Sequence, residues 1–132
     1  MVQVEREIMA AVDSLKTILD GLSSNDGISV AGIVSRNGVP IVCNLPAGSQ
    51  VDTFSTLSAT IMGAGEVIFT GMGKEKPNTI FLSSPNGNML CTPISQKSLL
   101  IIVGEKDLQG LLSVAENAKA TIKEVLSNGQ KA

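Results

Sequence analysis

Histidine, the side chain most often used for proton transfer in enzymes, is absent from all 132 residues of this chain. Ser-His and Cys-His nucleophile pairs therefore cannot form. The two cysteines, Cys43 and Cys91, lack the Cys-x-x-Cys spacing of zinc and redox motifs. No acidic pair is placed in a cleft by sequence alone. We therefore expect no catalytic residues, no bound metal and no cofactor, and we predict that the chain is not itself an enzyme.

One glycine- and lysine-containing segment, residues 70–76, superficially resembles a phosphate-binding loop. Such a loop has a glycine five residues before its Gly-Lys pair and Ser or Thr directly after the lysine. Ile68 and Glu75 occupy those two positions here. The segment also follows a predicted helix and precedes a predicted strand, which is the reverse of the required order. We interpret it as a helix C-cap followed by a charged loop, and predict no nucleotide binding by this chain.

Arg36 is the only arginine outside the first predicted helix. An arginine can contact a partner protein or stabilise a phosphoryl-transfer transition state in trans. Arg36 lies at the tip of a predicted hairpin, however, where a solvated side chain is the commoner outcome. We favour the solvated interpretation.

Composition restricts the classes of partner. The chain is 43% hydrophobic but only 2% aromatic, with no Trp or Tyr and a net charge of −2. Without a basic stripe or stacking platforms, nucleic-acid binding is not expected. The strongly apolar run 99–103 is too short to span a bilayer, and the first residues lack the apolar segment of a signal peptide. We expect a cytoplasmic protein without membrane insertion.

The hydrophobic pattern predicts the element order α-β-β-α-β-β-β-α within a single domain, residues 1–132. Helices are expected at about 3–22, 52–72 and 108–126, and strands at 28–35, 39–45, 79–83, 88–94 and 99–104.

Local signals predict how several of these elements end. Asn-Gly pairs at 37–38 and 86–87 favour tight hairpins in which both central residues have positive φ. Gly71 and Gly73 are candidate helix C-caps, and Asp107 is the expected N-cap of the last helix.

The strand order can be argued from burial. Residues 99–103 are apolar at every position, which predicts a strand buried on both faces in the middle of the sheet. Hairpin pairing then gives a five-stranded antiparallel sheet of order 2-1-5-4-3. The fold class is α+β, an α/β sandwich with the middle helix on one face and the other two helices opposite. Cys43 and Cys91 would lie three strand spacings apart, about 14 Å, which exceeds the separation of about 7 Å that a disulfide allows.

The middle helix lacks the charged side that solvent-exposed helices normally carry. One stripe is predicted to be its core face: Phe54, Leu57, Ile61, Gly65, Ile68 and Met72. The opposite side has small residues and one charge: Ser55, Thr56, Ala59, Thr60, Gly63, Glu66, Val67 and Thr70. We interpret this smooth side as a surface that packs against another protein. A helix buried within its own domain is the alternative.

The two predicted edge strands also differ. Pro40 and Pro46 flank strand two and limit pairing there, whereas strand three contains no charge and no proline. A second copy of strand three, antiparallel across a two-fold axis, would cover this edge, although a loop or a terminus could do the same. The predicted dimer interface comprises Thr79, Ile80, Phe81, Leu82 and Ser83 of the strand, and Ala59, Gly63 and Val67 of the helix.

The motif VAGIVSRNGVPIV, the small-residue helix and the hairpin PNGNMLCTPI resemble the Roadblock/dynein light chain family, over about residues 5–126. The style is that of stand-alone prokaryotic members of the gliding-motility, GTPase-activating type. The resemblance implies a homodimer or heterodimer joined through strand three, with paired central helices as a platform. It also implies a small Ras-like GTPase as partner, whose switch loops are reshaped without an inserted arginine, or an adaptor role in a larger assembly.

We therefore expect a homodimeric regulatory platform that binds a small Ras-like GTPase, with stimulation of GTP hydrolysis as a further expectation. The predicted partner-binding residues are Ser55, Ala59, Thr60, Glu66 and Thr70, with Glu66 as the candidate for a specific polar contact. Two alternatives remain open: a PAS-like or profilin-like small-molecule sensor, and a purely structural adaptor. A sensor would need an open pocket with converging polar groups, and the scarcity of aromatic residues counts against it.

Overall fold

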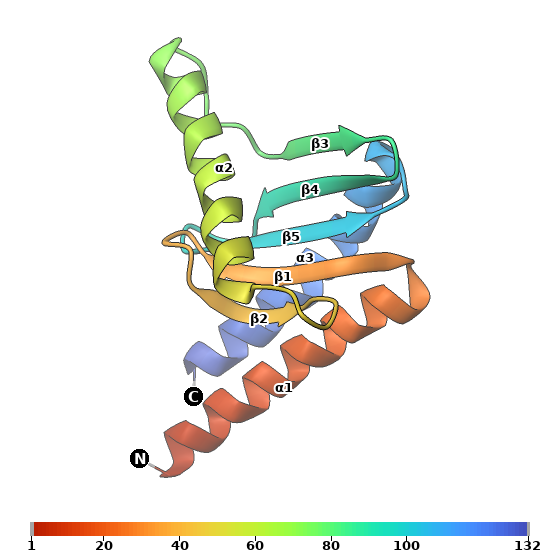
Figure 1. Ribbon diagram of the computed structural model, residues 1–132. Coiled ribbons are helices and arrows are strands. Elements are labelled where there is room, and N and C mark those ends of the chain that lie inside the picture. Colours follow the sequence, from red (N-terminus) through yellow and green to blue (C-terminus); the bar gives the residue numbers. More distant parts are fainter. Residues whose placement is uncertain (1, 132) are drawn as a thin grey trace.

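A computed structural model describes residues 2–131 and confirms the predicted element order (Figure 1). The helices are α1 (Val2–Asn25), α2 (Val51–Gly71) and α3 (Leu108–Lys131). The strands are β1 (Ile28–Ser35), β2 (Pro40–Asn44), β3 (Ile80–Ser84), β4 (Gly87–Pro93) and β5 (Ser98–Gly104).

The sheet has the predicted antiparallel order β2-β1-β5-β4-β3. β5 is central, and all of its residues except Val103 are buried. Its continuous apolar sequence follows from this position, because consecutive residues such as Ile101 and Ile102 point to opposite faces and both faces are covered. β2 and β3 are therefore the two edges.

The helices are divided between the two faces as expected (Figure 1). α1 and α3 lie against one face, where Leu15, Leu19 and Ile122 pack with Ile33 and Ile102 of the sheet. α2 crosses the other face alone. A smaller cluster forms beneath it, made of Val34, Met62, Cys91, Leu99 and Ile101. α2 thus covers only a part of its face.

The hairpin turns differ in type from the prediction. In the first turn Gly38 alone has positive φ, at 87°, and Asn37 does not. The N–H of Gly38 donates to the Ser35 carbonyl at 3.0 Å, so residues 35–38 form a turn that ends in a left-handed glycine. In the second turn Pro85 and Asn86 are the two loop residues. Pro85 holds φ near −65°, which excludes the positive φ of a type I′ turn.

Two predicted helix caps are confirmed. Gly73 has φ 73°, its N–H donates to the Thr70 carbonyl at 3.1 Å, and the N–H of Lys74 donates to Phe69 at 2.9 Å. This pair of bonds is a Schellman motif, with Gly73 in the left-handed position that glycine favours. At the start of α3, the N–H of Gly110 donates to Oδ1 of Asp107 at 2.9 Å, as an N-cap requires. Among residues 2–131 no helix has both the length and the apolarity needed to cross a bilayer.

Candidate protein-binding surface

The side of α2 that packs on the sheet combines two serines with the large side chain of Met62, and the predicted core stripe contributes Phe54 to it. Ser55, Ser58 and Met62 are the buried residues of this helix. Small side chains let the helix approach the sheet closely, and Gly32 of β1 does the same from below. A Cβ built on Gly32 would lie only 2.7 Å from Cε2 of Phe54. The missing side chain therefore makes room for the ring of Phe54.

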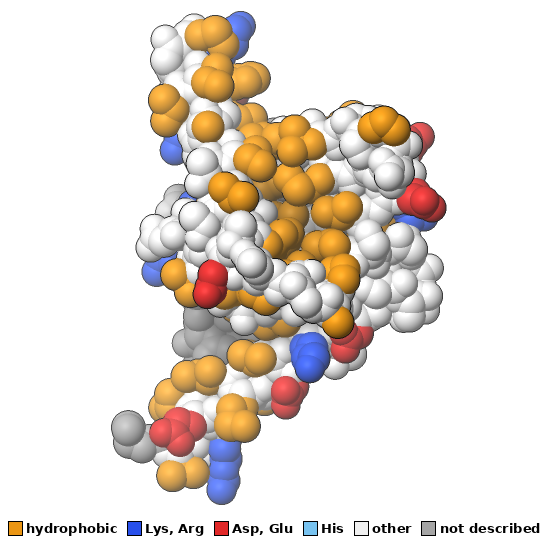
Figure 2. All heavy atoms as spheres, viewed as in Figure 1, with side chains coloured by type: hydrophobic (Ala, Val, Ile, Leu, Met, Phe, Trp, Pro, Cys, Tyr) orange, Lys and Arg blue, Asp and Glu red, His pale blue; other side chains and the backbone are white. Residues whose placement is uncertain are grey.

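Half of the stripe that was predicted as the core face of α2 is exposed, whereas Phe54, Ile61 and Gly65 are half-buried. Leu57, Ile68 and Met72 keep 56%, 57% and 60% of their surface accessible. The prediction was wrong for these three residues because periodicity identifies an apolar stripe without showing what covers it. Figure 2 shows hydrophobic side chains gathered along this side of α2 and over the neighbouring sheet. We refer to Leu57, Ile61, Ile68 and Met72 as the apolar flank of α2.

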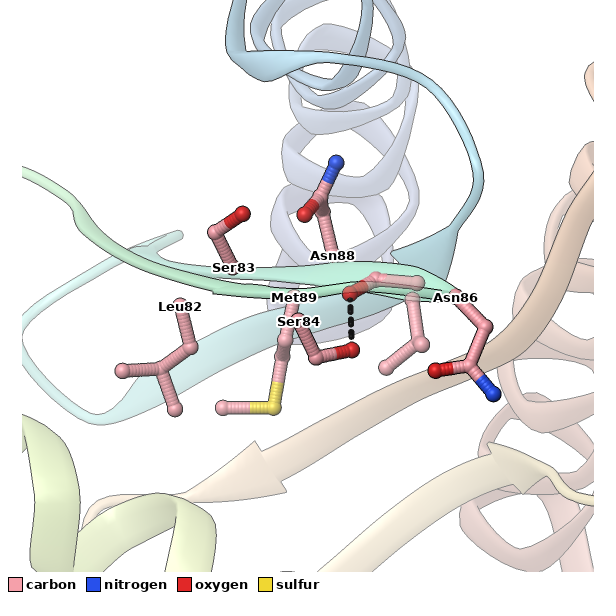
Figure 3. A pocket seen from close by; sticks show the side chains of 8 residues that line it. Leu82, Ser83, Ser84, Asn86, Asn88 and Met89 are labelled. Carbon is pink, nitrogen blue, oxygen red and sulfur yellow. Dashed lines mark hydrogen bonds between the residues drawn. The ribbon is translucent and has the colours of Figure 1, made fainter.

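The sheet beside the apolar flank is also uncovered. Leu82, Met89 and Val103 lie in one row across β3, β4 and β5 and line a wide-open hollow of about 420 Å³. Leu82 and Met89 point to the same side of the β3–β4 hairpin, and Ser83 points to the other (Figure 3). Leu82 is 45% exposed, although it is an apolar residue on the interior side of a sheet. The face that carries α2 is therefore only half covered.

The C-terminal end of α2 extends beyond β3, the last strand of the sheet on this side, and therefore has no strand beneath it (Figure 1). Phe69 belongs to this overhanging end and is 39% exposed. Each molecule thus has two uncovered apolar surfaces near the β3 edge, both on the face of the sheet that carries α2. One is the overhanging end of α2, and the other is the part of the sheet that no helix covers.

β3 is an edge strand with five residues, and all of them are at least partly exposed. The predicted interface residues on this segment occupy different places. Ile80 lies under Gly65 of α2, and Phe81 packs into the cluster on the α1 and α3 side. Leu82 and Ser83 are exposed, and Thr79 precedes the strand.

The predicted interface residues of α2 lie away from the apolar flank. Ala59 packs into the cluster beneath its own helix. Gly63 is partly buried, whereas Val67 is 71% exposed. The helix spacing places Gly63 and Val67 on the side opposite to the apolar flank.

Arg36 and Glu66 form an ion pair that no sequence pattern predicted. Nη1 of Arg36 donates to both carboxylate oxygens of Glu66, at 3.0 and 2.9 Å, and the side chains are only 29% and 15% exposed. The backbone N–H of Arg36 donates to the Lys97 carbonyl at 3.0 Å. Arg36 is therefore not a solvated hairpin tip, and Glu66 is not an unengaged surface charge. The pair ties two turns of the sheet to α2.

A second contact holds the same turn against α2. A Cβ built on Gly38 would lie 3.1 Å from the Cα of Thr56. The β1–β2 turn thus lies directly beside the N-terminal half of the helix, on the side opposite to the apolar flank.

The predicted partner-binding residues are only partly accessible. Ser55 is fully buried against the sheet and is not on the surface. Thr60 and Thr70 are exposed, but their hydroxyls donate to the helix carbonyls of Thr56 and Glu66, at 2.8 and 2.9 Å. Their methyl groups therefore form the outer surface.

Neither thiol is placed to act as an ionised nucleophile. Burial raises the pKa of Cys43, and burial raises the pKa of Cys91 to about 12. Both thiols are free, as predicted, and stay protonated near neutral pH. Within residues 2–131 no three potential ligand side chains cluster in a way that could hold a metal ion.

The model of the Roadblock/LC7 domain matches residues 15–104. Three solved structures share the fold at low sequence identity. "MglB with tetrameric arrangement" is 15% identical, with a TM-score of 0.80 over 91% of this chain and 93% of that one. Myxococcus xanthus MglB is 13% identical, with a TM-score of 0.81 over 89% and 91%. The gliding protein MglB of Thermus thermophilus is 15% identical, with a TM-score of 0.77 over 93% of each chain.

A further likeness in fold is to a profilin. Profilin II of Acanthamoeba castellanii is 13% identical and has a TM-score of 0.61 over 81% of this chain and 94% of that one. No curated protein matches this sequence.

Proposed function

The chain belongs to the Roadblock/LC7 domain family, and from that premise we propose that it is a homodimeric platform that binds a small Ras-like GTPase. The proposal includes stimulation of GTP hydrolysis by the partner. The likeness in fold to MglB gliding-motility proteins is consistent with such a role.

The observation that carries the dimer is the match between two uncovered surfaces at the β3 edge. A two-fold axis beside β3 would pair the two edge strands. It would also place the overhanging end of each α2 above the open row Leu82, Met89 and Val103 of the other copy. A single two-fold rotation would thus pair the open strand β3 with its copy, cover the apolar flank and fill the hollow. A stable interface of this kind buries about 1,200–2,000 Å² in total.

The proposed surface for the GTPase is the other side of α2, around Thr60, Gly63, Val67 and Thr70. It carries no free charge, and its side chains are short, so little side-chain entropy is lost on binding. In the dimer the two surfaces would face outwards, because each lies on the side of α2 opposite to the apolar flank that the dimer covers. Switch loops ordered by a γ-phosphate change shape between the GTP and GDP states, which would make binding nucleotide-dependent.

Glu66 takes a supporting role in this proposal, because Arg36 already binds its carboxylate. Arg36 is held in the same pair and is not free to enter a partner's active site. Stimulation would therefore come from repositioning the partner's own catalytic groups.

The sensor alternative is less well supported. The hollow beside α2 is lined mainly by apolar side chains and is wide open, whereas a small-molecule site is enclosed and has converging polar groups. The titration with small GTPases described next distinguishes the adaptor alternative from the proposed function.

The test is calorimetric titration of this protein with candidate small GTPases loaded with GDP or with a non-hydrolysable GTP analogue. We expect binding in one nucleotide state, and at least about tenfold weaker binding for Val67→Arg, since the interface would bury a charge that has no partner. Lys123→Glu, an exposed change on α3, should leave the affinity unchanged. Absence of binding in both nucleotide states would favour the adaptor role.

A further inference from the structure

The first half of α1 extends beyond the core that the second half helps to form. Leu15, Leu19 and Leu22 are buried under the sheet. Towards the N-terminus the apolar side chains are exposed instead, and Figure 2 shows them along the lower end of the helix. They are Val4, Ile8, Met9 and Val12, with 52%, 58%, 65% and 39% of their surface accessible. A contiguous exposed patch of this kind marks an interaction surface.

Two charges, Glu5 and Lys16, are placed symmetrically about two of these apolar residues. Glu5, Met9, Val12 and Lys16 are separated by four, three and four residues and so lie on one side of α1. All four are exposed. Read from either end, the stripe has a charged residue, two apolar residues and a charged residue, and the two terminal charges have opposite signs.

We propose that this stripe binds the same stripe of a second copy of the chain, with the two α1 helices antiparallel. In that arrangement Glu5 lies opposite Lys16 of the second copy, Met9 lies opposite Val12, and both relations recur by the two-fold symmetry. A parallel pair would instead place Glu5 against Glu5 and Lys16 against Lys16. The sequence of charges therefore selects the antiparallel pair, as flanking charges do in coiled coils.

The contact is separate from the proposed interface at β3, because α1 lies on the other face of the sheet. It does not depend on the proposed function. The stripe is only about 17 Å long at 1.5 Å per residue, so the association is weak and concentration-dependent. Combined with the β3 dimer, it produces assemblies larger than a dimer.

The experiment is sedimentation velocity of the Leu82→Lys variant at concentrations from about 1 μM to about 1 mM. This background removes the proposed β3 interface, so that association through α1 is observed by itself. We expect a monomer that dimerises as concentration rises, and no dimer when Met9→Glu is added. Ser14→Glu, an exposed change on another side of α1, is the matched control and should leave the association unchanged.

Charge reversal tests the antiparallel register. Lys16→Glu should weaken the association about tenfold, because two attractions become two repulsions. Glu5→Lys combined with Lys16→Glu should restore it. Circular dichroism verifies that each variant is folded. A Leu82→Lys chain that stays monomeric at every concentration, an association that Met9→Glu does not affect, or a double reversal that fails to restore it would each overturn the proposal.

Discussion

At the scale of single residues, the pair of Arg36 and Glu66 has the clearest energetic consequence. The two residues are 30 positions apart in sequence and belong to a hairpin turn and a helix. Each is partly shielded from water, so removing one partner leaves the other charge in an unfavourable place. The pair therefore has a structural role whether or not a partner protein contacts it.

This role predicts non-additive mutations. Arg36→Ala should lower the free energy of unfolding by about 1–3 kcal/mol, because the carboxylate of Glu66 loses its donor. Arg36→Ala combined with Glu66→Ala should cost less than the sum of the two single changes, by about 1 kcal/mol. Urea unfolding of the four proteins measures this coupling. Strictly additive values would show that the pair contributes nothing to stability.

The two thiols give a second prediction at this scale. Burial raises the pKa of Cys91 to about 12, so near pH 8 the native thiol is almost entirely protonated. Native protein treated with N-ethylmaleimide at pH 8 should be modified at the half-buried Cys43 well before Cys91. In denaturant both should react at similar rates, as mass spectrometry of the peptides would show. Equal rates in the native protein would contradict the burial of Cys91.

At the scale of elements, the close approach of α2 to β1 is the feature that sets the geometry of the surface. The ring of Phe54 occupies the space above Gly32, and Cys43 closes it from β2, with its Sγ 3.2 Å from a Cβ built on Gly32. An added methyl group has no empty volume to enter, so either the ring or the helix must move.

Gly32→Ala should therefore destabilise the fold by about 1–3 kcal/mol, as overpacking does. Gly63→Ala is the matched control, because a Cβ there meets nothing within 4 Å, and a helix-interior alanine should stabilise by about 0.5–1 kcal/mol. Thermal or urea unfolding compares the two. If Phe54→Leu is introduced as well, most of the Gly32→Ala cost should disappear. If the double variant is still destabilised as much as Gly32→Ala alone, the backbone and not the ring of Phe54 causes the loss of stability.

At the scale of the whole molecule, the half-covered face of the sheet predicts a dimer in solution. Light scattering at micromolar concentration should give about twice the chain mass of 13.7 kDa, or more where the α1 contact also forms. Leu82→Lys should shift the protein towards monomer, because it places a charge in the surface that the overhanging α2 of the other copy would cover.

The opposite edge of the same sheet offers a matched control for this dimer. Ile41 on β2 has a similar exposure, 40% against 45% for Leu82, and Ile41→Lys should leave the mass unchanged. A monomeric wild-type mass would contradict the dimer. A loss of mass in Ile41→Lys alone would place the interface on β2.

Several features of the fold could be predicted from the sequence alone, since each rests on a local or one-dimensional signal. The continuous apolar run of β5 required a central strand, and the hairpins then ordered the remaining strands. Gly73 and Asp107 predicted the ends of helices, because positive φ and capping oxygens are properties of single residues and their neighbours. The absence of charge and proline from β3 identified the edge that is open to pairing.

Other features were decided only by the tertiary structure. Periodicity located the apolar stripe of α2, but not whether it meets the chain's own sheet or solvent, because that depends on which side can approach the sheet most closely. The small residues Ser55 and Ser58 allow the closer approach, so they were buried and Leu57 and Ile68 were left outside. The ion pair of Arg36 and Glu66 follows from the same docking of α2 beside the β1–β2 turn. Contacts between residues 30 positions apart depend on how packed elements meet, and no local pattern encodes them.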